Sequence, residues 1–393
     1  MVTQVQPVTD QAAVRFMVRS GPDLSSAAWR LLCAFAFAIP FSIALAQTLL
    51  VAATVVALAD WWARGRPLRS TPLDLPILAF ALSGLLGAIV GLSFWDSFWG
   101  LRTYLQVVII YLVYAYTDSA DRALRLVLCF LAGSAIAAVY AVLGALAPGL
   151  FPRLFLGQMT QSGQLLFAIA FALALLLERV RTARSTALAL LAFVLALIVN
   201  LKRGVWLGAL AGVAAMGLLA SRRIILVAGI VVTLAVIAAP PVRARITNSA
   251  RDLSLPGNRY DIWLAAVDVI GRFPMGVGRK NGEILRDYPN IPRHHKHAHD
   301  NLLQVTLENG FLGLAAFLWW MGRFAGLAWT ACRRLPPHET AFRAIAIAVF
   351  ASLVGFQVAG LVEYNFGDSE VLEAFFLTMG LGLVVHERSR GYG

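Results

Sequence analysis

Long apolar segments, separated by short polar connections, occupy most of this 393-residue chain. A helix that crosses a bilayer needs about 20 apolar residues, so each segment of that length predicts a span. The segments are residues 28–45, 46–62, 73–92, 98–116, 123–147, 161–177, 184–200, 204–220, 223–239, 302–331, 341–362 and 370–386. Only Pro40 interrupts the first apolar run, so the boundary between the first two segments is unmarked. The pattern predicts an all-α, polytopic membrane protein with about twelve transmembrane helices.

The polar segment 240–301 interrupts this pattern between the ninth and tenth predicted spans. Pro240 and Pro241 end the preceding helix, because proline lacks the N–H group that a helix needs. Residues 258–272 carry an apolar stripe at helical spacing, which predicts an amphipathic helix, with Trp263 as a candidate for the membrane interface. The chain therefore divides into nine spans in residues 1–239, one large loop in residues 240–301, and three spans with a C-terminal tail in residues 302–393.

The composition favours a membrane protein over a soluble one. Charged residues make up 14% of the chain, against about a quarter in soluble domains, and hydrophobic residues make up 59%. The N-terminal region carries charges and lacks an apolar h-region, so no cleavable signal peptide is expected. Cys33, Cys129 and Cys332 fall in or beside apolar segments, which favours apolar packing over a disulfide or a reactive thiolate.

Arginines gather on alternate connections between the predicted spans, as they do in cytoplasmic loops. They are Arg15, Arg19, Arg30, Arg64, Arg66, Arg69, Arg122, Arg125, Arg179, Arg181, Arg184, Arg222, Arg223, Arg333, Arg334, Arg343, Arg388 and Arg390. The other short connections hold fewer basic residues and several acidic ones. Both termini are therefore predicted to be cytoplasmic, and the loop 240–301 faces the opposite side, which is the periplasm of a Gram-negative cell.

The net charge of +12 has two separate sources. Most basic residues flank apolar segments as topology signals, so no nucleic-acid partner is expected. The loop 240–301 nevertheless holds ten lysines and arginines, although it faces away from the cytoplasm. Such a field predicts an anionic ligand, which Arg279 and other basic residues of the loop are expected to attract.

Four of the six histidines lie within Arg293–Asn301, at the end of this loop. Histidine changes its charge near neutral pH, so the tract is a candidate for general base catalysis or anion binding. A zinc site is the alternative, because imidazoles bind zinc well. The spacing of the four histidines does not match an established zinc motif, so the prediction is that no metal is bound.

The residues that follow the tract resemble a known family motif, in which a histidine and a small polar residue precede nine residues, Gly, two residues and Gly. Here the motif is His299-Asp300, nine residues, and Gly310-Phe-Leu-Gly313. Lys202-Arg203-Gly204, Arg259 with Trp263, and the segment 274–278 also fit. These residues resemble the O-antigen ligase family, which shares its core with O-antigen polymerases and bacterial protein O-oligosaccharyltransferases. Asp300 departs from the pattern, since the family usually has an amide or serine there.

The resemblance implies a GT-C-like glycosyltransferase of the bacterial inner membrane whose active site faces the periplasm. Such an enzyme transfers an O-antigen glycan from undecaprenyl diphosphate to a sugar hydroxyl of lipid A–core. The family works with inversion and without a metal or other cofactor. The partners expected are these two lipid-linked substrates and the membrane lipids. An O-antigen polymerase and a protein O-oligosaccharyltransferase remain alternatives within this class, and a transporter or lipid flippase is the alternative outside it.

Four residues are assigned to the chemistry on this basis. His299 is the candidate general base, and a solvated histidine in a histidine-rich tract is the alternative. Arg203 and Arg259 are the candidates for binding the diphosphate, because a guanidinium can hold phosphate oxygens bidentately. Lys202 is a weaker candidate for the same role. A membrane-surface anchor is the alternative for Arg203, and a solvated loop arginine is the alternative for Arg259.

Five further residues have two interpretations each. His297 either positions the acceptor or is solvated, and Asp300 is one of several groups that could orient the ring of His299. Gln161 and Gln164 either bind glycan or diphosphate, or make polar contacts between helices. Glu363 either orients a catalytic arginine and binds sugar, or forms a structural salt bridge to an arginine of the loop; the salt bridge is the preferred interpretation.

Overall fold

The structure is a computed structural model that describes residues 23–64, 69–151, 157–180, 183–249, 251, 255, 257–293 and 295–392. Every regular element within these residues is a helix. The long apolar segments of the sequence dictate this result, because a helix satisfies all of its own backbone hydrogen bonds in a lipid environment. The prediction of an all-α fold is confirmed for the described residues.

Seven apolar helices in the described ranges are long enough to cross a membrane. They are α3 (Ile43–Arg64), the run of α5 (Phe94–Gly100), η1 (Leu101–Val107) and α6 (Val108–Tyr116), α7 (Ala120–Leu146), α8 (Gln158–Leu177), α15 (Asn301–Arg334), α16 (Thr340–Gly360) and α17 (Ser369–Arg390). The shorter apolar helices are α2 (Leu24–Ala38), α4 (Asp74–Val90), α9 (Ala183–Val199) and α10 (Arg203–Leu219). A polytopic membrane protein is thereby supported, and the count of twelve spans stays a prediction.

Two breaks in the helices coincide with prolines. The first divides α2 from α3 at Pro40, so the predicted boundary between residues 45 and 46 is wrong by about one turn of helix. The second lies between α11 (Arg223–Ala238) and α12 (Pro240–Thr247), which meet at an angle of 101°. The prolines cannot donate the hydrogen bonds that would continue either helix.

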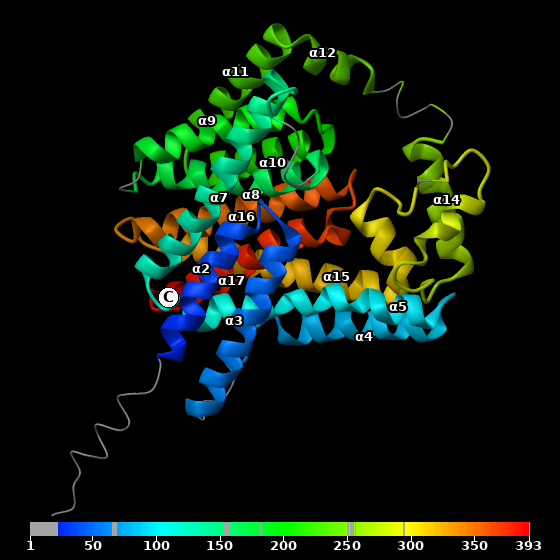
Figure 1. Ribbon diagram of the computed structural model, residues 1–393, viewed down its shortest axis with the longest axis horizontal. Coiled ribbons are helices and arrows are strands. Elements are labelled where there is room, and N and C mark those ends of the chain that lie inside the picture. The colour runs from blue at the N-terminus through cyan, green and yellow to red at the C-terminus, as the bar shows by residue number, and fades with distance from the viewer. Residues whose placement is uncertain are drawn as a thin grey trace, which may run out of the picture.

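Helices α8, α16 and α17 lie at the centre of the molecule (Figure 1). The rings of Phe356 in α16 and Phe375 in α17 stack with their centroids 4.1 Å apart. Glycines let α10 approach α16 closely, since a Cβ atom at Gly208 would lie 2.5 Å from the carbonyl oxygen of Gly355. Such contacts between small residues drive helix association where lipid weakens the hydrophobic effect.

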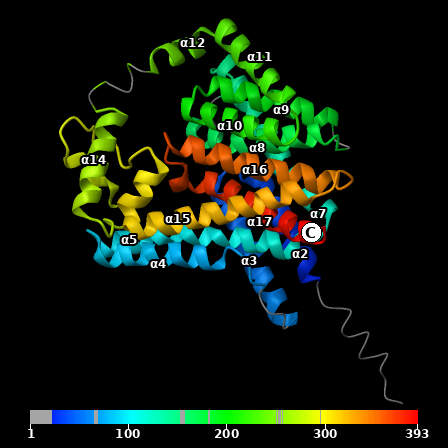
Figure 2. The same cartoon turned by 180° about the vertical axis from the view of Figure 1, so that it is seen from behind.

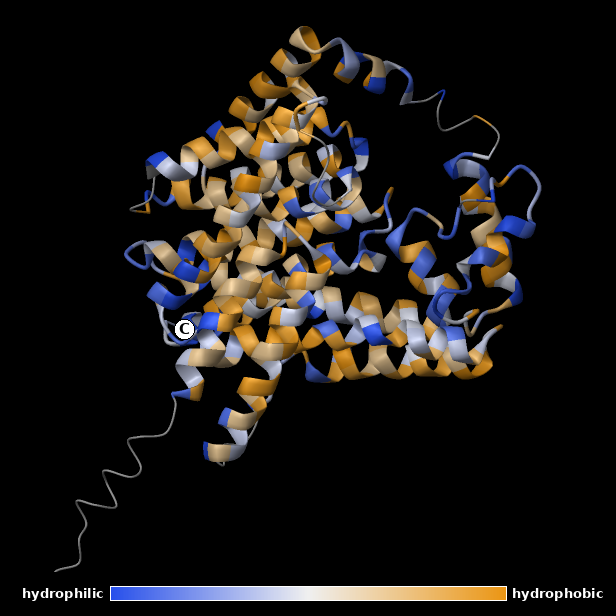
Figure 3. Ribbon diagram, viewed as in Figure 1, coloured by the Kyte–Doolittle hydropathy of each residue, from blue (hydrophilic) through white to orange (hydrophobic). Residues whose placement is uncertain are grey.

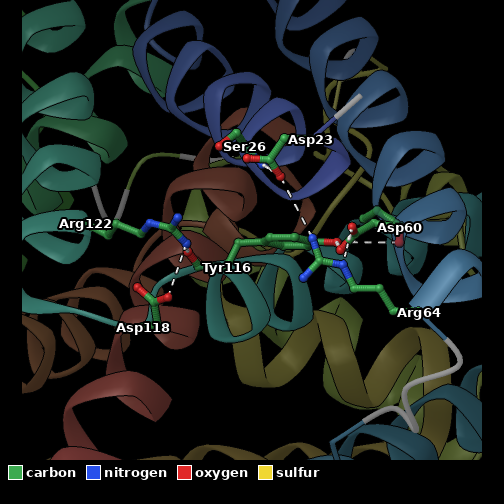
Figure 4. Close-up of polar contacts among 8 residues, drawn as sticks. Asp23, Ser26, Asp60, Arg64, Tyr116, Asp118 and Arg122 are labelled. Atoms are coloured by element: carbon green, nitrogen blue, oxygen red, sulfur yellow. Dashed lines mark hydrogen bonds and ion pairs between the residues drawn. The ribbon is translucent and has the colours of Figure 1, made fainter. Parts of the chain in front are cut away.

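Polar side chains tie α2, α3, α6 and α7 together at one end (Figure 4). Arg64 at the end of α3 pairs with Asp60 at 2.8 Å, and the hydroxyl of Tyr116 donates to the same carboxylate at 3.1 Å. Arg122 at the start of α7 pairs with Asp118 at 3.3 Å and donates to the backbone carbonyl of Tyr116 at 3.1 Å. Two of the arginines counted above as topology signals therefore also join helices.

The later part of the loop segment, from residue 257, forms a lobe at the end of the molecule opposite the C-terminus, apart from α12 (Figures 1 and 2). It contains α14 (Arg259–Arg272) and η2 (Asn281–Asp287), and it is more polar than the helices beside it (Figure 3). The buried side of α14 consists of the residues of the apolar stripe, which pack on Val277 and Leu285 of the same lobe and on Leu307 of α15. The expected amphipathic helix is therefore present and its stripe faces protein, and the place of Trp263 at the membrane interface stays a prediction.

Candidate active site

The histidine tract ends where α15 begins. Asp300 is the N-cap of this helix, since its Oδ1 accepts a hydrogen bond of 2.8 Å from the amide of Leu303. His299, directly before it, has φ of +51°, the left-handed conformation that residues other than glycine rarely adopt. The side chain of Asp300 therefore serves the helix, and the backbone beside it turns sharply to place His299.

The spacing between His299 and Gly310 has a structural cause. Gly310 has φ of +68° and breaks the helical geometry inside α15. The segment from Pro274 to Gly278 hydrogen-bonds into that break, with Phe311 donating to Pro274 at 3.0 Å and Gly278 donating to Glu308 at 3.0 Å. A Cβ atom at Gly310 would lie 2.5 Å from the carbonyl oxygen of Pro274, so only glycine fits.

Three imidazole rings gather at the end of the loop. Nε2 of His299 lies 3.2 Å from Nδ1 of His295, and the rings of His297 and His299 have centroids 4.1 Å apart. Burial and the neighbouring imidazoles lower the pKa of His297 to about 4, so this ring is neutral at pH 7. His294 lies outside the described residues. Across the described part of the chain, no group of three or more His, Cys, Asp or Glu residues is arranged to hold a metal ion.

Glu363 joins the histidines to the arginines. This buried carboxylate follows α16, and its Oε1 accepts a hydrogen bond of 2.5 Å from Arg259. Its Oε2 lies 3.8 Å from Nδ1 of His299, which is within ion-pair distance but too long for a hydrogen bond. Burial raises the pKa of Glu363, but His299 and Arg259 more than offset this and hold the pKa below its ordinary value. The expected salt bridge to a loop arginine is therefore present, and Glu363 also lies beside the candidate base.

Arg203 is the first residue of α10, and Lys202 is the N-cap. The adjacent Gly204 packs directly on Glu363, since a Cβ atom there would lie 2.7 Å from Cγ of Glu363. The positive end of the α10 dipole thus lies beside the carboxylate. The guanidinium of Arg203 donates to the carbonyl of Arg245 at 3.1 Å and to Oγ of Ser249 at 3.0 Å. The fold therefore brings the starts of α10, α14 and α15 to the loop after α16.

An apolar cavity of about 470 Å³ opens beside Arg203, between α8, α9, α10 and α11. Arg203 and Ser249 are among the few polar residues that line it. The residues of α10 that line it run from Arg203 down to Val213, so the arginine lies at one end of the cavity. The arrangement can hold an apolar chain with an anionic group at the end where Arg203 lies.

Gln161 and Gln164 make contacts between helices. Gln161 donates to the carbonyl of Ala137 at 2.9 Å and accepts from Asn200 at 3.0 Å. Gln164 donates to the carbonyls of Ile39 and Glu370, at 3.1 and 3.2 Å. These bonds join α8 to α2, α7, α9 and α17, which is the second of the two interpretations given for these residues above.

The sequence pattern did not predict the burial and the mutual contacts of a group of residues behind the histidines. Arg279, expected to attract an anionic ligand, is buried, 3.6 Å from Glu308 and 4.7 Å from the ring centroid of Tyr104. That expectation is wrong, because the guanidinium is enclosed by protein. Tyr364, next to Glu363, donates to Glu308 at 3.2 Å. The glycines at 276 and 278 are the only local signal that the chain passes close to α15 here.

A family model described as O-Antigen ligase matches residues 187–318. The matched range includes Arg203, Arg259 and His299, and it ends in α15 before Glu363. No curated protein matches the chain. The match covers the motif residues that carry the resemblance, so the resemblance to the O-antigen ligase family is confirmed over residues 187–318.

Proposed function

We propose that this protein is an O-antigen ligase. It transfers an O-antigen glycan from undecaprenyl diphosphate to a sugar hydroxyl of lipid A–core, with inversion and without a metal ion. The observation that carries the proposal is the position of His299, whose imidazole lies beside the Glu363–Arg259 pair. This arrangement supports the roles of His299 as proton acceptor and of Arg259 as a phosphate-binding group.

The donor lies with its polyprenyl chain in the apolar cavity beside Arg203. The apolar walls of the cavity keep the polyprenyl chain out of water. The guanidinium of Arg203, at the end of the cavity nearest the loop, binds the diphosphate. The dipole at the start of α10 favours the same negative charge. Lys202, at the N-cap, adds to the positive field. The supporting observation is the placement of Arg203 at the end of the cavity.

Arg259 holds the leaving group while the glycosidic bond breaks. One nitrogen of its guanidinium is bound to Glu363, and the remaining N–H groups can donate to phosphate oxygens. Negative charge grows on the diphosphate as it leaves, so a fixed guanidinium stabilises the transition state more than the ground state. Glu363 fixes the orientation of Arg259 and does not itself bind phosphate.

His299 takes the proton from the acceptor hydroxyl. Glu363 lies on the Nδ1 side of the ring, which favours the tautomer with the proton on Nδ1, so the base is Nε2, on the side where His295 lies 3.2 Å away. The carboxylate then balances the charge of the imidazolium that forms. The gap of 3.8 Å shortens when substrate is bound, as catalytic hydrogen bonds often do. The acceptor oxygen attacks the anomeric carbon on the side opposite the diphosphate, which gives inversion.

The direct test is transfer in vitro by the purified protein, with lipid-linked glycan and lipid A–core, in the presence and absence of a chelator. Transfer that survives the chelator supports the proposal. Transfer to another repeat unit, or to a protein, would make the chain a polymerase or a protein O-oligosaccharyltransferase instead. A cell that lacks this protein distinguishes a ligase from a polymerase. Loss of a ligase leaves long lipid-linked polymer, whereas loss of a polymerase leaves single repeats.

A transporter or flippase fits these observations less well. Transporters place charged residues and broken helices near the middle of the bilayer. Here the titratable residues of the candidate site lie in the loop and at the ends of α10, α15 and α16. Movement of lipid-linked glycan across vesicles without transfer to lipid A–core would favour that alternative.

A further inference from the structure

Ala298, the residue before His299, is held through both of its backbone polar groups. The amide of Ala298 donates to Oε1 of Gln304 at 2.7 Å, and its carbonyl accepts from Nε1 of Trp263 at 3.1 Å. Ala298 is completely buried. A left-handed residue persists only where its surroundings hold it, and these two bonds hold the chain directly before the +51° turn at His299.

Gln304 is itself oriented by buried residues. Its Nε2 donates to Oε1 of Glu308 at 2.9 Å, and Oε2 of Glu308 accepts from Tyr364 at 3.2 Å. Arg279 lies 3.6 Å from Glu308 and balances its charge. Gln304 is 1% exposed and Glu308 is 5% exposed, so both are shielded from water that would weaken these bonds.

The hydrogen bonds form a continuous chain from one part of the site to the other. They run from Ala298, next to His299, through Gln304 and Glu308 to Tyr364, next to Glu363. The ring of Tyr364 also lies 5.6 Å from that of His297. The chain therefore connects the backbone that carries the base to the backbone that carries its carboxylate.

We propose that Gln304 and Glu308 are positioning residues, which hold His299 at its distance from Glu363 by fixing the backbone at Ala298, the residue before it. Neither side chain touches the substrates. Without Gln304 the backbone of His299 relaxes to an ordinary, negative φ angle. Its imidazole then moves away from the carboxylate of Glu363. The proposal rests on the proposed function, in which His299 is the base.

The test replaces Gln304 with leucine, which has similar volume and no hydrogen-bonding group. Thr306→Val is the matched control, because Thr306 is also buried in α15 and its hydroxyl bonds only within the helix, to the carbonyl of Leu302 at 2.7 Å. We expect Gln304→Leu to lower kcat about tenfold to a hundredfold, as misplacement by about 1 Å does, with the KM for the donor within about twofold. Thr306→Val leaves both constants near those of the wild type.

A second variant separates positioning from loss of folding. Exchanging the two side chains, with Gln304→Glu and Glu308→Gln together, rebuilds the acceptor for Ala298 and the bond between positions 304 and 308. We expect this double variant to have a higher kcat than either single variant, which is the signature of a coupled pair. If the leucine variant does not fold, the comparison of the double variant with its two singles still decides.

Two results would overturn the proposal. One is a Gln304→Leu protein with wild-type kcat, and the other is a double variant no more active than the more active of its two singles. The proposed function fails separately, when wild-type protein gives no transfer or when His299→Ala remains active. An inactive His299→Ala beside a fully active Gln304→Leu would refute the positioning role alone.

Discussion

At the residue scale, the site depends on which imidazoles carry charge. Burial and its neighbours keep His297 neutral down to a pKa of about 4, while the lowered pKa of Glu363 keeps that carboxylate ionised. His299 lies between them, with its ring packed on His297 and its Nδ1 facing Glu363. A neutral neighbour on one side and a negative one on the other is the setting in which a histidine can accept and release a proton.

The pH dependence of stability should report His297. Its pKa falls from 6.5 in the unfolded chain to about 4 in the fold, so the unfolded chain binds more protons between these values. Acidification therefore favours unfolding, and we expect the Tm to fall as the pH is lowered from 6.5 to 4. Glu363 acts in the same direction at the lower end of this range.

The variant His297→Gln isolates the contribution of the imidazole. Glutamine does not titrate, so the Tm of this variant should change less over the same range. Measurement by thermal unfolding in detergent at several pH values, with His338→Gln as the exposed control, decides the point. An equally steep pH dependence of the Tm in wild type and His297→Gln would show that folding does not lower the pKa of His297.

At the scale of elements, the break in α15 explains why glycine stands at position 310. The turn at Gly310 lets the segment from Pro274 to Gly278 bond to the exposed backbone of the helix. The same helix carries Asp300 as its cap and His299 before it. The loop and the candidate base are therefore both attached to the part of α15 that precedes its break, so disturbance of the break moves the site.

Replacement of Gly310 by alanine should destabilise the protein. The positive φ and the contact with Pro274 leave no room for a Cβ atom, so we expect a loss of about 1–3 kcal/mol. Gly322→Ala is the control in the same helix, since nothing lies within 4 Å of the Cβ atom it would add. Alanine there should keep or raise the Tm, because it favours the helix over glycine. Equal Tm values for the two variants would contradict the assigned role of the break.

At the scale of the whole molecule, the fold joins an apolar cavity to a charged lobe. Helices α8 to α11 enclose the cavity, and Arg203 at its end is the neighbour of Gly204, which packs on Glu363. The loop supplies Arg259 and the histidines from the other side. A lipid-linked donor can thus keep its chain among helices while its diphosphate reaches the base.

Filling the cavity should weaken binding of the donor. Ala228 lines the cavity from α11, so Ala228→Trp occupies space that the polyprenyl chain needs. We expect the KM for the donor to rise about tenfold to fiftyfold, which corresponds to the loss of two or three buried methylene groups at about 0.8 kcal/mol each. Leu218→Trp on α10, which is 77% exposed, is the control and should leave this KM unchanged. An unchanged KM in the cavity variant would place the lipid chain elsewhere.

The sequence predicted the helices well, because membrane helices follow local apolar length. It also identified His299, Arg203 and Arg259, which carry the motif of the family. It could not predict that Arg279 is buried, or that Gln304 bonds to Ala298, because these depend on how the loop folds back on α15. The contact between Arg259 and Glu363 joins residues 104 positions apart. From the sequence we could predict a salt bridge from Glu363 to an arginine of the loop, but not which arginine.

The central claim is that His299 is the base of a glycan transfer, and His299→Ala tests it most directly. The measurement is kcat for transfer from lipid-linked glycan to lipid A–core by purified, folded protein, with His338→Ala as the control. The account predicts that kcat falls about a hundredfold or more in His299→Ala, as loss of a general base requires, and that the control is unchanged. Transfer by His299→Ala at the wild-type rate would contradict the account.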